Sequence, residues 1–197
     1  MTSDAHVAMD RMYRHQRYIY DLTRKFYLFG RDKLIAELPV QGNDLICEVG
    51  CGTARNLVLL AKRHRNAKFF GVDASTEMLK TAGASIDAAG VGHLVKVAPA
   101  LSTDFTAEQF GQARPFDRLI FSYSLSMIDS WRESLEYALS QLRPGGTIHV
   151  VDFGDQAGLP GWFKLALKKW LDQFHVRFRP EVRALFDEQE KAGCGRM

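Results

Sequence analysis

The chain has 197 residues, of which 46% are hydrophobic and 25% charged, and its 26 lysines and arginines against 23 aspartates and glutamates give a net charge of +3. This composition predicts one globular domain with a sizeable core, and it excludes a disordered chain and a multi-span membrane protein. Because the cysteines are few and odd in number, they exclude a disulfide framework and predict a reduced, cytosolic protein: Cys47, Cys51 and Cys194.

The first segment predicts one or two amphipathic helices over residues 5–36. Tyrosines and methionines form its apolar side, and arginines line its polar side. Residues 1–6 lack the apolar region of a secretion signal, so export is not expected. We therefore interpret residues 1–38 as an N-terminal helical lid.

Short apolar runs then alternate with segments of helical periodicity over residues 39–155, which is typical of a parallel sheet covered by helices. Crossovers between parallel strands are right-handed, so all strands end at one edge of the sheet, where ligands bind. The expected strands are Leu45–Val49, Lys68–Asp73, Leu94–Ala98, Phe116–Tyr123 and Gly146–Phe153, and the expected helices are Ala54–Arg63, Ser75–Ala88 and Ser130–Leu142.

Two local signals mark the end of this core. Ser130 and Glu133 have the spacing of a capping box, which predicts that the Ser130 side chain caps the following helix. Residues Arg143–Gly146 predict a tight turn before the last strand, because proline presets φ and glycine accepts a positive φ.

The last segment, residues 156–197, predicts amphipathic helices that belong to the same domain. Like the N-terminal lid, these helices are basic and aromatic, so they either pack on the sheet as ordinary covering helices or dock on an anionic membrane surface. The residues that suggest docking are Trp162, Phe163, Trp170, Lys164, Lys168 and Lys169.

A glycine loop follows the first strand directly. Gly50 and Gly52 permit a sharp turn and leave room for a ligand, and the next helix presents free N–H groups there. Asp73 ends the second strand, where a carboxylate can accept hydrogen bonds from both hydroxyls of a ribose. Together they predict a site for an adenosine cofactor.

Two residues of the loop discriminate between such cofactors. Arg55 stands where a dinucleotide-binding loop has glycine or alanine, which disfavours NAD. Glu48 would repel a pyrophosphate but attract the ammonium or sulfonium group of S-adenosylmethionine. The charge therefore favours a methyl donor. Cys51, inside the loop, is expected to be a small filler rather than a nucleophile.

Three ordered motifs resemble those of the class I S-adenosylmethionine-dependent methyltransferases: Glu48-x-Gly50-x-Gly52-x-Ala54, Asp73-x-Ser75-x-x-Met78-Leu79 and Leu142–Gly146. The resemblance implies an α/β fold, a three-layer, doubly wound, mostly parallel Rossmann-like sheet. It also implies S-adenosyl-L-methionine as the cofactor, S-adenosyl-L-homocysteine as the product, and no metal. The implied cofactor-binding residues are Glu48, Gly50, Cys51, Gly52, Asp73, Ala74, Met78, Ala100, Leu101 and Ser122.

The flanks add a closer resemblance, to the bacterial enzymes that N-methylate diacylglyceryl-homoserine to make betaine lipids. It is carried by residues His15–Arg24, Leu28–Asp32, Phe121–Ile128, Val151–Asp155, Gly158–Pro160 and Trp162–Phe163. The resemblance implies successive methylation of a lipid primary amine by a peripheral protein at the inner face of the membrane, with a lipid-homoserine synthase upstream. The alternatives are phosphatidylethanolamine N-methylation, quinone C-methylation, and a non-catalytic S-adenosylmethionine-binding module.

Methyl transfer from a sulfonium is an in-line displacement, so the main task of the protein is to position the reactants. Aromatic faces and carboxylates would stabilise the cationic product of amine methylation. Four residues are accordingly expected to position the acceptor, although Tyr20 would serve equally well in packing the lid: Tyr20, Tyr123, Asp152 and Asp155.

Two further expectations concern what the chain lacks. No nucleic-acid substrate is expected, because Ser122–Leu125 stands where enzymes that methylate base amines carry an Asn/Asp-Pro-Pro-aromatic segment. Class I methyltransferases usually finish with a helix and an antiparallel pair of strands, for which the residues after Phe153 are too few. We therefore expect either a short sheet or a truncated C-terminal strand pair.

Overall fold

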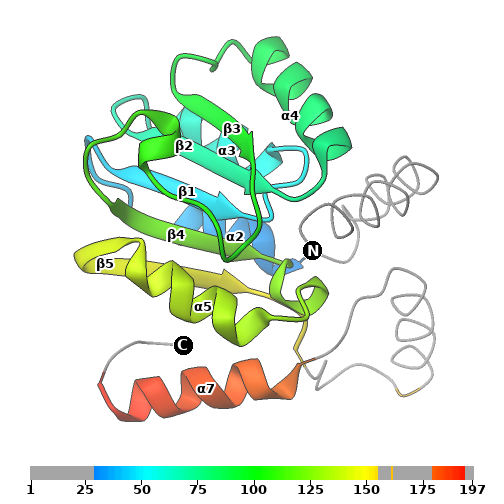
Figure 1. Cartoon of the computed structure of the whole chain (residues 1–197), viewed down its shortest axis with the longest axis vertical. Helices are drawn as coiled ribbons and strands as arrows, with labels where there is room; N and C mark the ends of the chain where they lie inside the picture. The colour runs from blue at the N-terminus through cyan, green and yellow to red at the C-terminus, as the bar shows by residue number, and fades with distance from the viewer. Residues whose placement is uncertain (1–28, 155–160, 162–178, 194–197) are drawn as a thin grey trace.

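A five-stranded parallel sheet forms the centre of the molecule (Figure 1). The computed structural model describes residues 29–154, 161 and 179–193. The strands lie in the order β3-β2-β1-β4-β5, and every neighbouring pair is parallel. Their bounds are β1 Leu45–Val49, β2 Lys68–Asp73, β3 Val95–Pro99, β4 Phe116–Ser122 and β5 Leu142–Val151.

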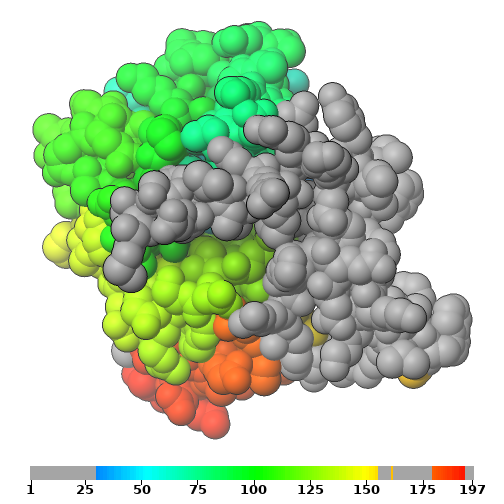
Figure 2. Space-filling view, turned by 45° about the vertical axis from the view of Figure 1, so that its right-hand side comes forward, coloured from blue at the N-terminus to red at the C-terminus, as the bar shows by residue number. Residues whose placement is uncertain are grey.

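Helices cover both faces of the sheet. One face packs against α2 (Phe29–Glu37), α3 (Arg55–Arg63) and α4 (Thr76–Ala88). The other face packs against α5 (Trp131–Ser140) and α7 (Pro180–Lys191), which lie along the same side of the molecule in Figures 1 and 2. Two short 3-10 helices, Glu108–Phe110 and Leu125–Met127, complete the described elements.

The strand sequences explain why the sheet has a helical layer on each face. In β1, Leu45, Cys47 and Val49 enter the core beneath α5, while Ile46 enters the core beneath α3. Successive side chains of a strand point to opposite faces, so a strand that is buried at every position needs cover on both sides. All five residues of β1 and all seven of β4 are buried.

The connections change face between β1 and β4. The chain runs outward from β1 to β2 and β3 through α3 and α4, then returns to β4 and continues to β5 through α5 on the other face. Loops after β1 and β4 therefore diverge and leave a crevice at the carboxyl edge, where open α/β sheets bind ligands. The three-layer, doubly wound α/β fold expected from the sequence is confirmed.

Two local expectations were wrong. Ser130 does not cap α5 with its side chain, because its backbone has a ψ of 42° rather than the extended value that brings the hydroxyl toward the helix N–H groups. Residues Arg143–Gly146 do not precede β5 but bulge from within it. The pairing with β4 jumps there from Phe116↔Leu142 to Arg118↔Thr147, and Gly145 has a φ of 75°.

The predicted lid and C-terminal helices are described only in part. Within residues 1–38 the structure describes α2, and within residues 156–197 it describes Gly161, α7 and the turn that follows α7. The basic aromatic residues from Trp162 to Trp170 lie outside the described residues. No helix in the described part of the chain is long and apolar enough to span a membrane.

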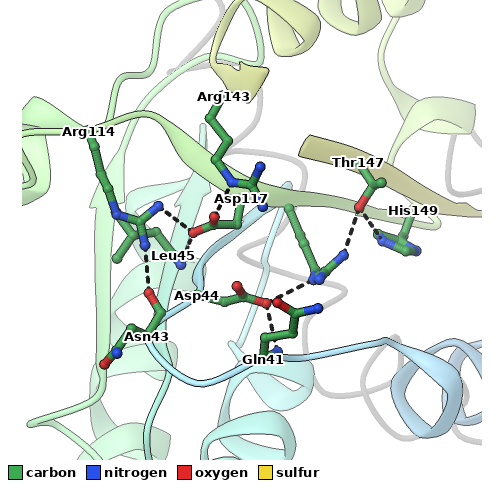
Figure 3. Close-up of polar contacts among 10 residues, drawn as sticks. Gln41, Asn43, Asp44, Leu45, Arg114, Asp117, Arg143, Thr147 and His149 are labelled. Atoms are coloured by element: carbon green, nitrogen blue, oxygen red, sulfur yellow. Dashed lines mark hydrogen bonds and ion pairs between the residues drawn. The ribbon is translucent and has the colours of Figure 1, made fainter. Parts of the chain in front are cut away.

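A polar network joins three strands at the amino edge of the sheet, opposite the crevice (Figure 3). The Asp117 carboxylate on β4 accepts hydrogen bonds from the Leu45 N–H at 2.7 Å, from Arg114 Nη1 at 2.6 Å and from Arg143 Nε. Burial opposes ionisation of Asp117, but these three donors outweigh it and hold the pKa of Asp117 below its ordinary value. The carboxylate therefore clamps β1, β4 and the bulge of β5 in register.

A second part of the same network pairs Asp44 with Arg118. The Asp44 carboxylate accepts from Arg118 Nε at 3.0 Å, and Arg118 Nη1 donates to Thr147 Oγ1 at 3.1 Å. Thr147 in turn bonds His149 Nε2 at 2.8 Å. Burial, together with the nearby Arg118 charge, lowers the pKa of His149 to about 4, so this imidazole is neutral at pH 7.

We predict that Asp117→Asn destabilises the protein by about 2 kcal/mol at pH 7, because Arg114 and Arg143 lose their charged partner. Both arginines are partly exposed, so water compensates for part of the loss. The folded-state pKa of Asp117 is lowered, so its contribution to stability is complete above the ordinary pKa of about 4 and is lost as the pH falls through the lower value. Urea unfolding at pH 7 and at pH 3 measures both effects. Asp87→Asn, on an exposed position of α4, is the control and should change neither.

Candidate functional site

The loop between β1 and α3 adopts a left-handed backbone three times in five residues. The φ angles are 75° at Gly50, 54° at Gly52 and 58° at Ala54. The N–H groups of Gly50 and Cys51 both donate to the Val72 carbonyl, at 2.8 and 3.0 Å. The loop is thus folded back against the end of β2.

Asp73 fixes this arrangement. One carboxylate oxygen accepts from the Gly52 N–H at 2.8 Å, and the other accepts from the Ser75 N–H at 2.9 Å. The carbonyl of Asp73 accepts from the Ala100 N–H at 3.2 Å, which also ties in the segment after β3. The structure therefore brings together three of the residues predicted from the sequence: Gly52, Asp73 and Ala100.

A cleft of about 430 Å³ lies beside the loop. Four of the predicted residues line it: Glu48, Gly50, Cys51 and Ser122. Sequence reasoning missed the others, which come from α2, from α4 and from the loop and first turn of α3: Arg31, Thr53, Arg55, Asn56, Thr81 and Ser85.

The walls of the cleft carry opposite charges. Glu48 is 2% exposed, and its Oε1 accepts from Asn56 Nδ2 at 2.6 Å. Arg31 is 8% exposed, and Arg55, which also lines the cleft, pairs its Nη1 with Asp32 Oδ1 at 3.1 Å. The cleft thus offers a buried anion on β1 and two cations on α2 and α3.

Several buried polar atoms at the site lack a hydrogen-bond partner among the described residues. They are Asn56 Oδ1 and the hydroxyls of Ser122, Ser124 and Ser126. A buried polar atom costs stability unless something bonds to it, so such atoms indicate where a ligand supplies the missing contacts. Asn56 and Ser122 line the cleft itself.

Cys51 packs rather than reacts. A Cβ atom on Gly71 would lie 2.7 Å from the Cys51 Sγ, so the thiol fills the space above that glycine. Burial raises the pKa of Cys51, and the nearby Asp73 and Glu48 charges raise it further. The protonated thiol fits the filler role expected from the sequence.

Tyr123 and Asp152 lie at the carboxyl ends of β4 and β5. The Tyr123 Oη accepts from the Gly30 N–H at 3.1 Å. The Asp152 oxygens accept from the Ser126 and Phe153 N–H groups, at 2.9 and 2.8 Å. Burial raises the pKa of Asp152 in spite of these bonds. The acceptor-positioning roles of both residues stay predictions.

The remaining predicted residues lie around or outside the cleft. Met78 is 2% exposed, and its N–H donates to Ser75 Oγ at the start of α4. Ala74 directly follows Asp73, and Leu101 directly follows Ala100, whose N–H donates to the Asp73 carbonyl. Tyr20 and Asp155 lie outside the described residues. Among the residues that are described, no group of three or more His, Cys, Asp or Glu side chains is placed to hold a metal ion.

Comparisons with known proteins agree with this geometry. A family model described as a methyltransferase domain matches residues 46–146, just over half of the chain. Trans-aconitate 2-methyltransferase of Pseudomonas paraeruginosa is 30% identical over 142 residues, which are 68% of this chain and 44% of that protein. The enzyme of the same name from Escherichia coli is 24% identical over 165 residues, 82% of this chain and 61% of that protein.

Solved structures share the fold. A methyltransferase from Geobacter sulfurreducens in complex with S-adenosyl-L-homocysteine has a TM-score of 0.58 at 17% identity, covering 87% of this chain and 69% of that one. An O-methyltransferase family protein from Burkholderia thailandensis has a TM-score of 0.63 at 18% identity, covering 86% and 52%. The chain spans between about two fifths and three fifths of the length of the curated relatives it matches.

We predict that Gly50→Ala distorts the cleft and destabilises the protein by about 1–3 kcal/mol, because a side chain is strained at this positive φ. The new methyl group would also lie 2.7 Å from Ser124 Cβ, which must move away. Urea unfolding followed by circular dichroism measures the loss. The control is Gly83→Ala in α4, where the added Cβ meets nothing within 4 Å and should stabilise the helix by about 0.5–1 kcal/mol. Equal stability of Gly50→Ala and the wild type would contradict the constraint.

Proposed function

Because the chain belongs to the methyltransferase domain family, we propose that it binds S-adenosyl-L-methionine at the carboxyl edge of the sheet and transfers the methyl group to an acceptor. The observation that carries this proposal is the hydrogen bond from the Gly52 N–H to the Asp73 carboxylate, which joins the glycine loop to the acid that ends β2. Both residues lie inside the part of the chain that the family model matches.

The polar groups of the cleft fit the amino-acid end of this donor. Glu48 and Asn56 Oδ1, which has no hydrogen-bond partner among the described residues, are acceptors suited to its ammonium group. Arg31 and Arg55 supply the positive charge for its carboxylate. Glu48 is buried, so its charge acts through surroundings of low polarity and attracts a cation more strongly than it would in water.

Asp73 is suited to the ribose. Its two oxygens accept hydrogen bonds from the Gly52 and Ser75 N–H groups, and a carboxylate, with two lone pairs on each oxygen, is the acceptor that two ribose hydroxyls require. The backbone bonds also hold the carboxylate in one orientation before a ligand arrives, so less ordering is required on binding.

In this proposal, the residues of the chain hold the donor and the acceptor in the orientation that the reaction needs. When bound, the donor would supply the methyl group of a sulfonium: the bond from this carbon to sulfur breaks as its bond to the acceptor forms, and the sulfur leaves as a neutral thioether. Such an in-line displacement needs the acceptor held close and in line rather than a strong base. We propose that Ser122, Tyr123 and Ser124, at the end of β4 and next to the glycine loop, border the acceptor.

For the acceptor, we propose the amine of diacylglyceryl-homoserine. The support is the sequence resemblance across the flanks, of which residues 29–32, 121–128 and 151–154 lie in the described part of the chain. The segments expected to dock on an anionic membrane surface, within residues 5–28 and 162–171, lie outside it, so peripheral attachment and an upstream lipid-homoserine synthase remain predictions.

A small carboxylic acid is the second candidate acceptor. The curated relatives that match the chain are named for the methylation of trans-aconitate, and one of them is 30% identical. Methyl transfer to a carboxylate would use the same donor site. Only the contacts with the acceptor would differ.

We predict that Asp73→Ala weakens the binding of S-adenosyl-L-homocysteine about 10- to 100-fold, because the charged hydrogen bonds to the ribose are lost. Isothermal titration calorimetry measures the affinity, and the melting temperature shows whether the variant is folded. Asp87→Ala removes an exposed carboxylate from α4 and should bind like the wild type. Unchanged affinity of a folded Asp73→Ala protein would refute the ribose assignment.

We predict that the purified protein transfers label from methyl-labelled S-adenosyl-L-methionine to diacylglyceryl-homoserine in mixed vesicles. Phosphatidylethanolamine, a quinone precursor and trans-aconitate are assayed in parallel. Label in trans-aconitate alone supports the second candidate, and label in phosphatidylethanolamine or the quinone assigns the alternative acceptors. Donor binding without label in any acceptor would leave the non-catalytic binding module as the better description.

A further inference from the structure

The hydroxyl of Tyr123 contacts the first turn of α2. Gly30 is the second residue of that helix, and its N–H, which has no partner within the helix, donates to Tyr123 Oη at 3.1 Å. Tyr123 follows β4 directly, 93 residues along the chain. One side chain at the carboxyl edge of the sheet therefore holds the start of a helix on its face.

Tyr123 has a strained backbone conformation, and this conformation sets the direction of its side chain. Its φ is 57°, a left-handed value that costs about 1–3 kcal/mol for a residue with a Cβ. The conformation is held by the bond from the Tyr123 N–H to the Val151 carbonyl at 2.7 Å. The ring packs against Phe153, with the ring centroids 4.9 Å apart. Both contacts come from β5 and the residues after it.

The start of α2 fits closely against the same place. A Cβ on Gly30 would lie 2.5 Å from Val151 Cγ2 and 3.3 Å from the Tyr123 hydroxyl, so only glycine allows this approach. The next residue is Arg31, which is 8% exposed and lines the cleft. Gly30, which donates the hydrogen bond to Tyr123, is thus the direct neighbour of the buried Arg31.

We propose that Tyr123 is a positioning residue for the donor site: its hydroxyl fixes the first turn of α2 and thereby holds Arg31 at the cleft. The inference rests on the proposed function, in which Arg31 faces the carboxylate of the donor. It assigns the strained tyrosine a role in binding the donor, distinct from the acceptor-positioning role expected from the sequence.

The hydroxyl remains a neutral phenol under ordinary conditions. Burial raises the pKa of Tyr123, and the nearby Asp152 charge raises it further, although the bond from Gly30 and the charge of Arg31 act in the opposite direction. The link between Tyr123 and α2 therefore does not change across the physiological pH range.

Tyr123→Phe tests the proposal, because it keeps the ring and removes only the hydroxyl. We expect the dissociation constant for S-adenosyl-L-homocysteine to rise about fivefold, as for one neutral hydrogen bond. In an Arg31→Met background, the same change should have less than about a twofold effect, since coupled residues are not additive. Tyr137→Phe in α5 is the matched control: it loses a 3.0 Å bond to the Phe105 carbonyl and should leave the affinity unchanged.

A second measurement does not require the donor. Amide hydrogen exchange of residues 29–37 should become faster in Tyr123→Phe and remain unchanged in Tyr137→Phe. Unchanged exchange, unchanged affinity, or an equal loss of affinity with and without Arg31 would each overturn the proposal. Wild-type protein that does not bind S-adenosyl-L-homocysteine would overturn the proposed function, whereas a wild type that binds and a Tyr123→Phe variant that binds equally well would overturn only this inference.

Discussion

The carboxylate of Asp73 accepts hydrogen bonds from the backbone N–H groups of Gly52 and Ser75, and this one group holds the loops after β1 and β2 together. The shape of the cleft follows from that contact. With the glycine loop held against β2, Gly50 faces Ser124 after β4 at a separation that excludes a Cβ. The ends of β1, β2 and β4 are thereby placed relative to one another before any ligand binds, which lowers the ordering cost of binding.

The charged groups at the two edges of the sheet differ in their surroundings. At the carboxyl edge, the buried Glu48 and Arg31 line the cleft, where Asn56 Oδ1 has no hydrogen-bond partner among the described residues. At the amino edge, Asp44 and Asp117 are fully engaged with arginines and backbone N–H groups. Ion pairs of this kind hold neighbouring strands in register, whereas a buried polar atom without a partner indicates where a ligand can supply a hydrogen bond. The ion pairs that stabilise the sheet thus lie at the edge opposite the cleft.

The helix α2 links the described core to the N-terminal residues of the chain. It is short, and its apolar contribution to the core comes mainly from Ile35 and Leu38, near and just past its end. Its first turn is held instead by the hydrogen bond from the Gly30 N–H to Tyr123 and by the close packing of Gly30 against Val151. Because Arg31 lies in that first turn and lines the cleft, the position of this positive charge depends on how α2 is attached to the sheet.

The sequence by itself determined the strand and helix alternation, the glycine loop and the position of Asp73 at the end of the neighbouring strand, because these depend on local periodicity and on residues joined by adjacent elements. The tertiary structure decided the rest. It turned the expected turn at Arg143–Gly146 into a bulge and left Ser130 without its expected cap. It also brought Arg31 and Asn56 to the cleft, since packing across the sheet, which no spacing along the chain encodes, sets which distant side chains meet.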